Sequence, residues 1–293
     1  MKINQIEKII NQNYWSINLG IARSFLALCT LVTLLFNPVD ALFSSSIHSK
    51  VGYAYNFFYI FGNFKISIII AAILLIVVMI GMYPRYTCIL HFWVAYSFST
   101  SGISVEGGDQ IVGIASLLLI PVLLFDKRKN HYSKSVENKN YYVNCIAFFS
   151  FTMISLQSSF LYFQAALGKI KIREWADGTA VYYWFNDNVF GVNNSILEYL
   201  NIALKSPVFI TLVTWGAIAI ELFIALAIFF KNKSIKITAF YTGIALHLFI
   251  ALCFGLISFF FAMAGVLILY LIPYNNLLKS FKRYKNEYIP SEI

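Results

Sequence analysis

Three ionisable side chains lie in or beside long apolar segments, where a charge is costly. Glu221 and His247 each lie inside an apolar run, and Lys169 stands where another run ends. In lipid such groups by default face a helix bundle or a wet cavity, where they pair with one another. Amines, imidazoles and carboxylates are the groups that exchange protons in catalysis. We therefore predict that Lys169, Glu221 and His247 form a catalytic site. The alternatives are structural hydrogen bonds for Glu221 and His247, and snorkelling to the headgroups for Lys169.

The stretch around Lys169, "LYFQAALGKIKIREWADGTAVYYWF", changes abruptly from apolar to charged and then to aromatic. This order is typical of a helix that leaves a bilayer, because aromatic side chains gather at the membrane interface. The acids Glu174 and Asp177 are also able simply to neutralise the neighbouring cations. Anchoring does not account for the grouping of an amide, a lysine and Trp-Ala-Asp-Gly at one helix exit. The residues of this stretch that we predict to bind a substrate are Tyr162, Gln164, Trp175, Asp177 and Gly178.

Two further acids, Glu106 and Asp109, flank a pair of glycines in the quartet "EGGD". They are suited to begin a helix as an N-cap and to complement its dipole. The alternative is a substrate, metal or proton site, and we include both acids among the candidate substrate-binding residues. For His91, inside another apolar run, packing is favoured over a functional role.

The overall composition predicts an integral membrane protein. Of 293 residues, 59% are hydrophobic and 12% charged, and the mean hydropathy is +0.72. A soluble domain has too little interior for so much apolar surface. The net charge of +9 comes from short basic stretches between apolar runs, a pattern of membrane anchoring that argues against nucleic-acid binding. The four cysteines lie in or beside apolar runs without a CxxC pair, which predicts buried small side chains and no metal site.

The apolar runs predict an all-α bundle of about eight transmembrane helices forming one polytopic domain over 1–293. A span needs about 20 apolar residues. The third and fourth runs are short enough to be tilted or partly re-entrant, and seven spans is the alternative count. The predicted spans are 17–36, 66–83, 87–100, 110–125, 141–168, 208–230, 235–255 and 257–273.

The basic residues predict the orientation of these spans. With eight spans, sixteen Lys and Arg residues fall on one side and six on the other, which places both termini in the cytoplasm. The segments 37–65, 100–109 and 169–207 then face outwards from a bacterial cytoplasmic membrane. We expect 169–207 to be a structured extracytoplasmic cap, with an amphipathic segment from Ser195 to Leu204.

The order of these motifs resembles a known group of membrane proteins. The chain contains a tyrosine-containing apolar helix, followed by Lys169, a charged spacer and the Trp-x-x-Gly of Trp175 to Gly178. This order is similar to the core of vitamin K-dependent gamma-carboxylases and related "horizontally transferred transmembrane" (HTTM) proteins. The run "GGDQIVGIASLLLIPVLLFD", Glu221 and His247 fit the same pattern, which covers nearly the whole chain. A chain of this length, without a large extracellular domain, most resembles the sporulation-delaying protein B (SdpB) family.

This resemblance implies a function that the residues by themselves do not show. It implies a maturation factor for a secreted antimicrobial peptide toxin, which works with a small SdpA-like partner on a secreted precursor. The resemblance to the carboxylases implies that Lys169 is a base acting on a reduced quinone.

The sequence leaves open whether the chain is an enzyme. A peptide-modifying or peptide-processing enzyme is one reading, although no Ser/His/Asp, HExxH or paired-aspartate motif supports an independent protease. A quinone-coupled enzyme is the second reading. A peptide transporter or immunity protein is the third, and the sequence lacks the inverted repeats expected of a transporter.

Overall fold

All eight predicted segments are α-helices in the computed structural model, which describes residues 7, 10–43, 55–133, 139–188, 191–192 and 194–272. No strand occurs among these residues. The described residues form one helical bundle, and a single domain over 1–293 remains a prediction. The eight main helices are α2 (Ile17–Phe36), α5 (Phe64–Ile80), α6 (Pro84–Ser101), α7 (Gly107–Leu123), α8 (Tyr141–Ile170), α12 (Pro207–Leu226), α13 (Lys233–Phe254) and α14 (Ile257–Leu271).

Polar residues mark the beginnings of most of these helices. At each of them a side-chain oxygen accepts a hydrogen bond from a backbone N–H of the first turn, which has no partner inside the helix. Sequence hydropathy locates the apolar runs, and these caps set where the helices begin. The capping residues are Ser16, Asn63, Asn140, Ser206 and Asn232.

Four helices of the described chain are long and apolar enough to cross a membrane: α2, α8, α13, and α12 with its continuation to Phe229. Helices α5, α7 and α14 are apolar but shorter. The chain is therefore a membrane protein, and eight spans remains a prediction. Helix α8 has 30 residues, or roughly 45 Å at 1.5 Å per residue. It exceeds the roughly 30 Å hydrocarbon core, so we expect it to be tilted.

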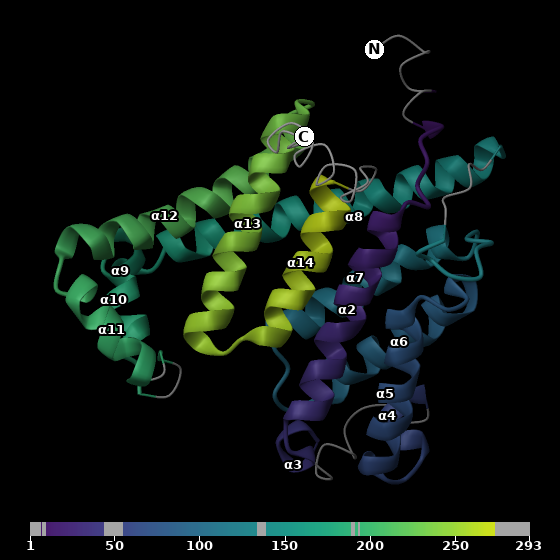
Figure 1. Cartoon of the computed structure of the whole chain (residues 1–293), viewed down its shortest axis with the longest axis horizontal. Coiled ribbons are helices and arrows are strands. Elements are labelled where there is room, and N and C mark those ends of the chain that lie inside the picture. Colours follow the sequence, from purple (N-terminus) through teal and green to yellow (C-terminus); the bar gives the residue numbers. More distant parts are fainter. Residues whose placement is uncertain are drawn as a thin grey trace, which may run out of the picture.

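The first and last helices lie side by side in the middle of the bundle (Figure 1). The Asn18 amide at the start of α2 donates a hydrogen bond of 2.5 Å to the carbonyl of Ile272, just after α14. The chain therefore begins and ends its bundle on the same side, as an even number of crossings requires. That this side is cytoplasmic remains a prediction.

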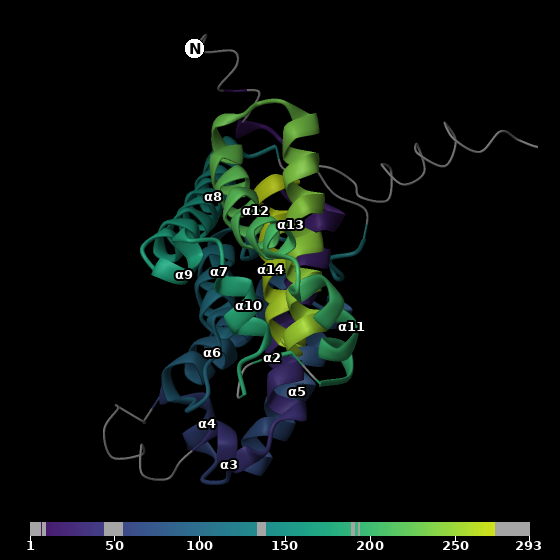
Figure 2. The same ribbon diagram turned by 90° about the vertical axis from the view of Figure 1, so that its left-hand side faces the viewer.

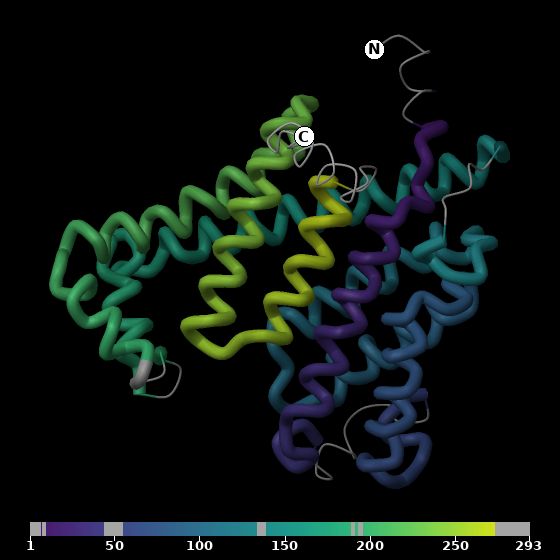
Figure 3. The backbone as a smooth tube through the Cα atoms, in the orientation of Figure 1, coloured from purple at the N-terminus to yellow at the C-terminus, as the bar shows by residue number. Residues whose placement is uncertain are grey.

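Around this pair the other helices form two apolar clusters. One joins α2 and α14 to α6, α7, α8, α12 and α13, and the other joins α2 to α5 and to other residues of α6. Two short helices, α3 (Val39–Leu42) and α4 (Phe57–Ile60), cover the second cluster at one end of the bundle (Figure 2). The tube in Figure 3 shows α13 and α14 as a hairpin, whose turn contains Gly255 at a φ of 73°.

The predicted cap is structured in the part described, although its side of the membrane remains a prediction. It contains α9 (Arg173–Ala176), α10 (Ala180–Phe185) and α11 (Asn194–Leu204). The amphipathic prediction for Ser195 to Leu204 agrees with three leucines of this segment, although Ile202 is 81% exposed. Leu197, Leu200 and Leu204 pack toward a third apolar cluster, whereas Tyr199 is exposed.

Two basic residues that the orientation count assigned to a membrane face are instead buried. Arg23 is fully buried within α2. Arg128 donates to both carboxylate oxygens of Asp126, with an Nη2–Oδ2 distance of 2.7 Å, and to the carbonyl of His131. Counting charges along the chain cannot distinguish these buried arginines from anchoring ones. His91 is also buried in α6, as its predicted packing role requires.

The segment after α7 folds inward as a plug at the ends of α2 and α5. The backbone N–H of His131 bonds the carbonyl of Gly81, and the Ser24 hydroxyl lies 3.3 Å from His131 Nε2. Burial, helped by the charges of Arg23 and Arg128, lowers the pKa of His131 to about 3. The imidazole is therefore neutral at pH 7, which suits a fully buried ring.

We expect Gly81→Ala to destabilise the fold more than Gly255→Ala does. Both glycines end helices with positive φ, of 90° and 73°, where an alanine costs roughly 1–2 kcal/mol. A Cβ at Gly81 would in addition clash with the His131 ring, whereas a Cβ at Gly255 would have no neighbouring atom within 4 Å. Unfolding by SDS titration in mixed micelles measures the difference. Equal losses in the two variants would show that the plug does not pack as described.

Candidate functional site

A large apolar pocket lies among α8, α12 and α13, and α9 and α10 border it. Its volume is about 1180 Å³. Gly168 of α8 and Gly216 of α12 both line the pocket, and a Cβ built on either would meet open space within 4 Å. Mostly apolar walls with a few polar groups are typical of ligand sites. The polar or amphipathic side chains in the wall include Gln164, Lys169, Trp175, Trp184, Glu221 and Thr242.

Lys169 and Glu221 form an ion pair in the wall of this pocket. The ammonium Nζ lies 2.7 Å from Oε1 and 2.9 Å from Oε2 of the carboxylate. Lys169 belongs to the last turn of α8, and Glu221 lies in the C-terminal half of α12, so the pair joins two helices. The Glu221 side chain is 9% exposed and that of Lys169 is 25% exposed. The pair thus satisfies a buried carboxylate and still presents the lysine to the pocket.

Trp175 covers the lysine from α9. Lys169 Nζ lies 5.4 Å from the centre of a Trp175 ring, a cation–π distance. The carbonyl of Trp175 accepts a hydrogen bond of 3.2 Å from the indole of Trp215, which ties α9 to α12. Carboxylate and indole therefore fix the ammonium from two sides. An amine free to act as a base at this place requires transfer of the ammonium proton to Glu221 or to another acceptor.

A second polar pair, Tyr162 and His247, is buried next to the pocket. The Tyr162 hydroxyl lies 2.8 Å from His247 Nε2, and both side chains are almost completely buried. Neither residue lines the pocket. Tyr162 lies within electrostatic range of Glu221, and His247 of Lys169. The three residues predicted to be catalytic are thus brought together, but His247 is separated from the pocket space.

The other residues of the Trp-x-x-Gly stretch have different surroundings. Gln164 lines the pocket with Lys169. Asp177 forms an exposed ion pair of 3.3 Å with Arg173. Gly178 has a φ of 77°, and a Cβ there would lie 2.8 Å from Thr211 Cγ2 of α12. Glycine at position 178 is therefore explained by its positive φ and by the close approach of the backbone to α12. Asp177 does not belong to the pocket wall.

Glu106 and Asp109 lie apart from the pocket and begin α7 as a capping box. The Glu106 backbone N–H donates to Asp109 Oδ2 at 3.2 Å, which confirms the interpretation as a helix start. Glu106 also accepts a bond of 3.1 Å from Ser258 of α14, and Asp109 one of 3.3 Å from Thr33 of α2. Both acids thus connect three helices, and their predicted role in substrate binding stays a prediction.

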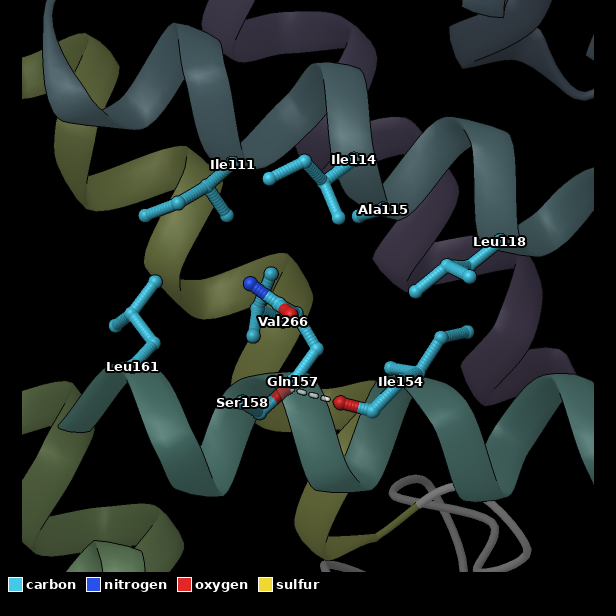
Figure 4. A pocket seen from close by; sticks show the side chains of 9 residues that line it. All are labelled: Ile111, Ile114, Ala115, Leu118, Ile154, Gln157, Ser158, Leu161 and Val266. Carbon is cyan, nitrogen blue, oxygen red and sulfur yellow. Dashed lines mark hydrogen bonds between the residues drawn. The ribbon is translucent and has the colours of Figure 1, made fainter. Parts of the chain in front are cut away.

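Gln157, on the same helix as Gln164, faces a different and much smaller pocket (Figure 4). This pocket lies between α7, α8 and α14, and its volume of about 20 Å³ is the size of a water molecule. Its other lining side chains are apolar except Ser158, which bonds Ile154 O of its own helix at 2.6 Å. Gln157 and Gln164 therefore line two separate pockets.

Most of the pocket wall was not predicted from the sequence. Leu212, Val213 and Phe249 line it from α12 and α13, yet in a sequence they resemble any lipid-facing residue. Trp215, which holds Trp175, carries a usable signal. It lies six residues before Glu221 in the same apolar run, and an indole N–H inside such a run needs an acceptor.

We expect Tyr162→Phe to destabilise the fold by about 1–3 kcal/mol, because it leaves His247 Nε2 buried without its partner. The double change Tyr162→Phe with His247→Phe should lose less than the sum of the two single changes. Tyr182→Phe, at a tyrosine that is 45% exposed, is the matched control. SDS titration measures all four variants. Strict additivity of the single losses would contradict the pairing.

Comparison with known proteins gives two relatives, both from Bacillus subtilis (strain 168). The chain is 38% identical over 283 residues to the sporulation-delaying protein SdpB, covering 93% of this chain and 87% of the relative. It is 33% identical over 277 residues to the uncharacterized protein YitO, covering 92% and 89%. No family model matches the chain, and no solved structure matches it significantly. The likeness to HTTM proteins and gamma-carboxylases remains a prediction. Because the identity extends over almost the full length of both chains, this protein belongs to the sporulation-delaying protein B (SdpB) family.

Proposed function

We propose that this protein is a membrane-embedded maturation factor for a secreted antimicrobial peptide toxin. It acts with a small SdpA-like partner on a secreted precursor at the extracytoplasmic face of the bacterial cytoplasmic membrane. The observation that carries this proposal is the 38% identity, over 93% of the chain, to the sporulation-delaying protein SdpB. The pocket supports it by offering a place for an apolar peptide segment beside a charged pair.

In this proposal the apolar and the charged residues of the pocket wall bind different parts of the precursor. The apolar sides from α12 and α13 receive an apolar stretch of the precursor, since a site of about 1180 Å³ admits several side chains. Lys169 and Glu221 contact the polar backbone of that stretch, because they are the charged residues in the wall. Gln164 and Trp175 border the same place.

Tyr162 and His247 act as positioning residues in this scheme. They lie behind the wall, where the hydroxyl–imidazole contact of 2.8 Å joins α8 to α13. A shift of α8 relative to α13 would move Lys169, which lies two turns further along the same helix. His247 therefore influences the pocket through helix placement and not by touching the peptide.

Comparing a strain that lacks this protein with its parent tests the proposal. Mass spectrometry of the culture supernatant should show a secreted peptide that disappears on deletion and returns with the wild-type gene. Unchanged secreted peptides would contradict a role in maturation. Loss of self-protection with an unchanged peptide would identify an immunity protein instead.

Complementation with single variants tests the site. We expect Lys169→Met and Glu221→Gln to lower the recovered peptide at least about tenfold, because each removes one partner of a buried charge pair and alters the pocket wall. Lys171→Met, at an exposed lysine two residues away, is the matched control and should restore the peptide fully. Immunoblots of membranes must show equal amounts of each variant. Normal peptide from both site variants at equal abundance would exclude the pair from the reaction.

A lipid-soluble reduced quinone is the second candidate occupant, favoured by the apolar walls that end at a lysine. The residues fit such a group: Leu212, Val213 and Phe249 offer an apolar bed, and Lys169 and Trp175 meet its polar head. When bound, a quinol would supply reducing equivalents, for which dioxygen would be the acceptor, and carbon dioxide would supply the carboxyl group added to the peptide. The chain's own Lys169 would take up a proton only after Glu221 or another acceptor had received the ammonium proton.

The mass of the peptide distinguishes the two readings. A quinone-coupled, carboxylase-like activity adds the mass of carbon dioxide to the peptide from the parent strain, and Lys169→Met removes this addition. A mature peptide whose mass equals that of an unmodified fragment of its precursor would rule out this second activity and leave processing.

A further inference from the structure

Arg23 is a completely buried cation in the first half of α2, a helix that contributes no residue to the pocket wall. Its Nη2 donates a hydrogen bond of 2.7 Å to the hydroxyl of Thr87, at the start of α6. Its Nε and Nη1 are also buried and have no hydrogen-bond partner among the described residues. A guanidinium stays charged and offers five N–H donors. Most of its donor capacity is therefore directed into the protein interior.

No acid in the described part of the chain forms an ion pair with Arg23. The acid within its electrostatic range at this end of the bundle is Asp126. Both oxygens of Asp126 already accept hydrogen bonds from Arg128, at 2.9 and 2.7 Å. Asp126 therefore attracts Arg23 only from a distance and forms its ion pair with Arg128. Burying a charge without a partner is strongly unfavourable.

Two histidines lie within electrostatic range of Arg23, and each has a buried nitrogen atom without a hydrogen-bond partner among the described residues. His91 follows Thr87 by one turn on the same face of α6. Ser24, the neighbour of Arg23, contacts Nε2 of His131. The charge of Arg23 acts on both imidazoles. His91 Nε2 and His131 Nδ1 are buried and have no hydrogen-bond partner among the described residues.

We propose that Arg23 and His91, with His131 beside them, form an internal binding site for a small inorganic anion such as chloride. A guanidinium offers several N–H donors and each neutral imidazole offers one, and an anion accepts several such bonds at once. It also supplies the missing negative charge. The complete burial of Arg23 and His131, and the 2% exposure of His91, suit a monatomic ion and not a lipid headgroup or a peptide carboxylate. This site is independent of the proposed function.

Thermal unfolding of the purified protein in detergent tests this site. Sodium chloride is compared with sodium gluconate at constant ionic strength, because gluconate is too large to be buried there. An anion that binds only the folded state increases the free energy of unfolding by RT ln(1 + [L]/Kd), so Tm rises with the anion concentration. We expect chloride to raise the wild-type Tm by at least about 3 °C over gluconate.

Arg23→Met should abolish the chloride effect, because it removes the charge and retains much of the side-chain volume. Its Tm in gluconate should equal or exceed that of the wild type, since the unpaired charge is gone. Arg85→Met is the matched control, at an exposed arginine at the start of α6, and should retain the full effect. An equal Tm of the wild type in both salts would overturn the proposal and favour bound water. An unchanged chloride effect in Arg23→Met would also overturn it.

Binding of radioactive chloride in equilibrium dialysis gives a second measurement. If Arg23→Met does not fold, His91→Phe removes Nε2 at similar volume and leaves Arg23 in place. We expect His91→Phe to weaken chloride binding at least about fivefold, because one of its donors is lost. Wild-type protein that retains no chloride, or His91→Phe that binds it as tightly as the wild type, would contradict the site.

Discussion

A polar group inside this bundle needs a partner in the protein or in a bound ion or water, because lipid offers no hydrogen bonds. The helix contacts follow from this requirement. Asn18 bonds the backbone beyond α14, the indole of Trp15 donates to the carbonyl of Val122 at 3.0 Å, and Tyr270 donates to that of Ile224 at 2.9 Å. Apolar side chains fit lipid and neighbouring helices about equally well. The polar contacts therefore select one arrangement of helices from many.

The same requirement accounts for the two ionic features of the bundle. The carboxylate of Glu221 is stabilised by an ammonium from another helix, and the pair faces a large pocket. Arg23 donates one side-chain hydrogen bond, to Thr87, and forms no ion pair with the described residues. A satisfied pair beside a cavity is suited to chemistry on a bound molecule. A buried cation with unused donors is suited to holding an ion.

The pocket and the Arg23 cluster lie at different parts of the bundle and use different helices. The pocket depends on α8, α12 and α13, with α9 packed across its edge through Trp175 and Gly178. The Arg23 cluster depends on α2, α6 and the plug after α7. Substitutions in one should therefore leave the other intact, since distant sites without shared partners act almost independently.

Sequence alone determined the class of protein, the approximate positions of the eight main helices, the break between the predicted spans 235–255 and 257–273, and the helix start at Glu106. Each of these depends on local composition: apolar length, a glycine at positive φ, or acids that cap neighbouring N–H groups. It also identified Lys169, Glu221 and His247 as one group, because charge in lipid requires pairing. Only the tertiary structure decided that Lys169 binds Glu221 while His247 binds Tyr162, that Asp177 is exposed, and that Arg23 and Arg128 are buried. Those outcomes depend on which helix faces meet, and residues far apart in the chain set that jointly.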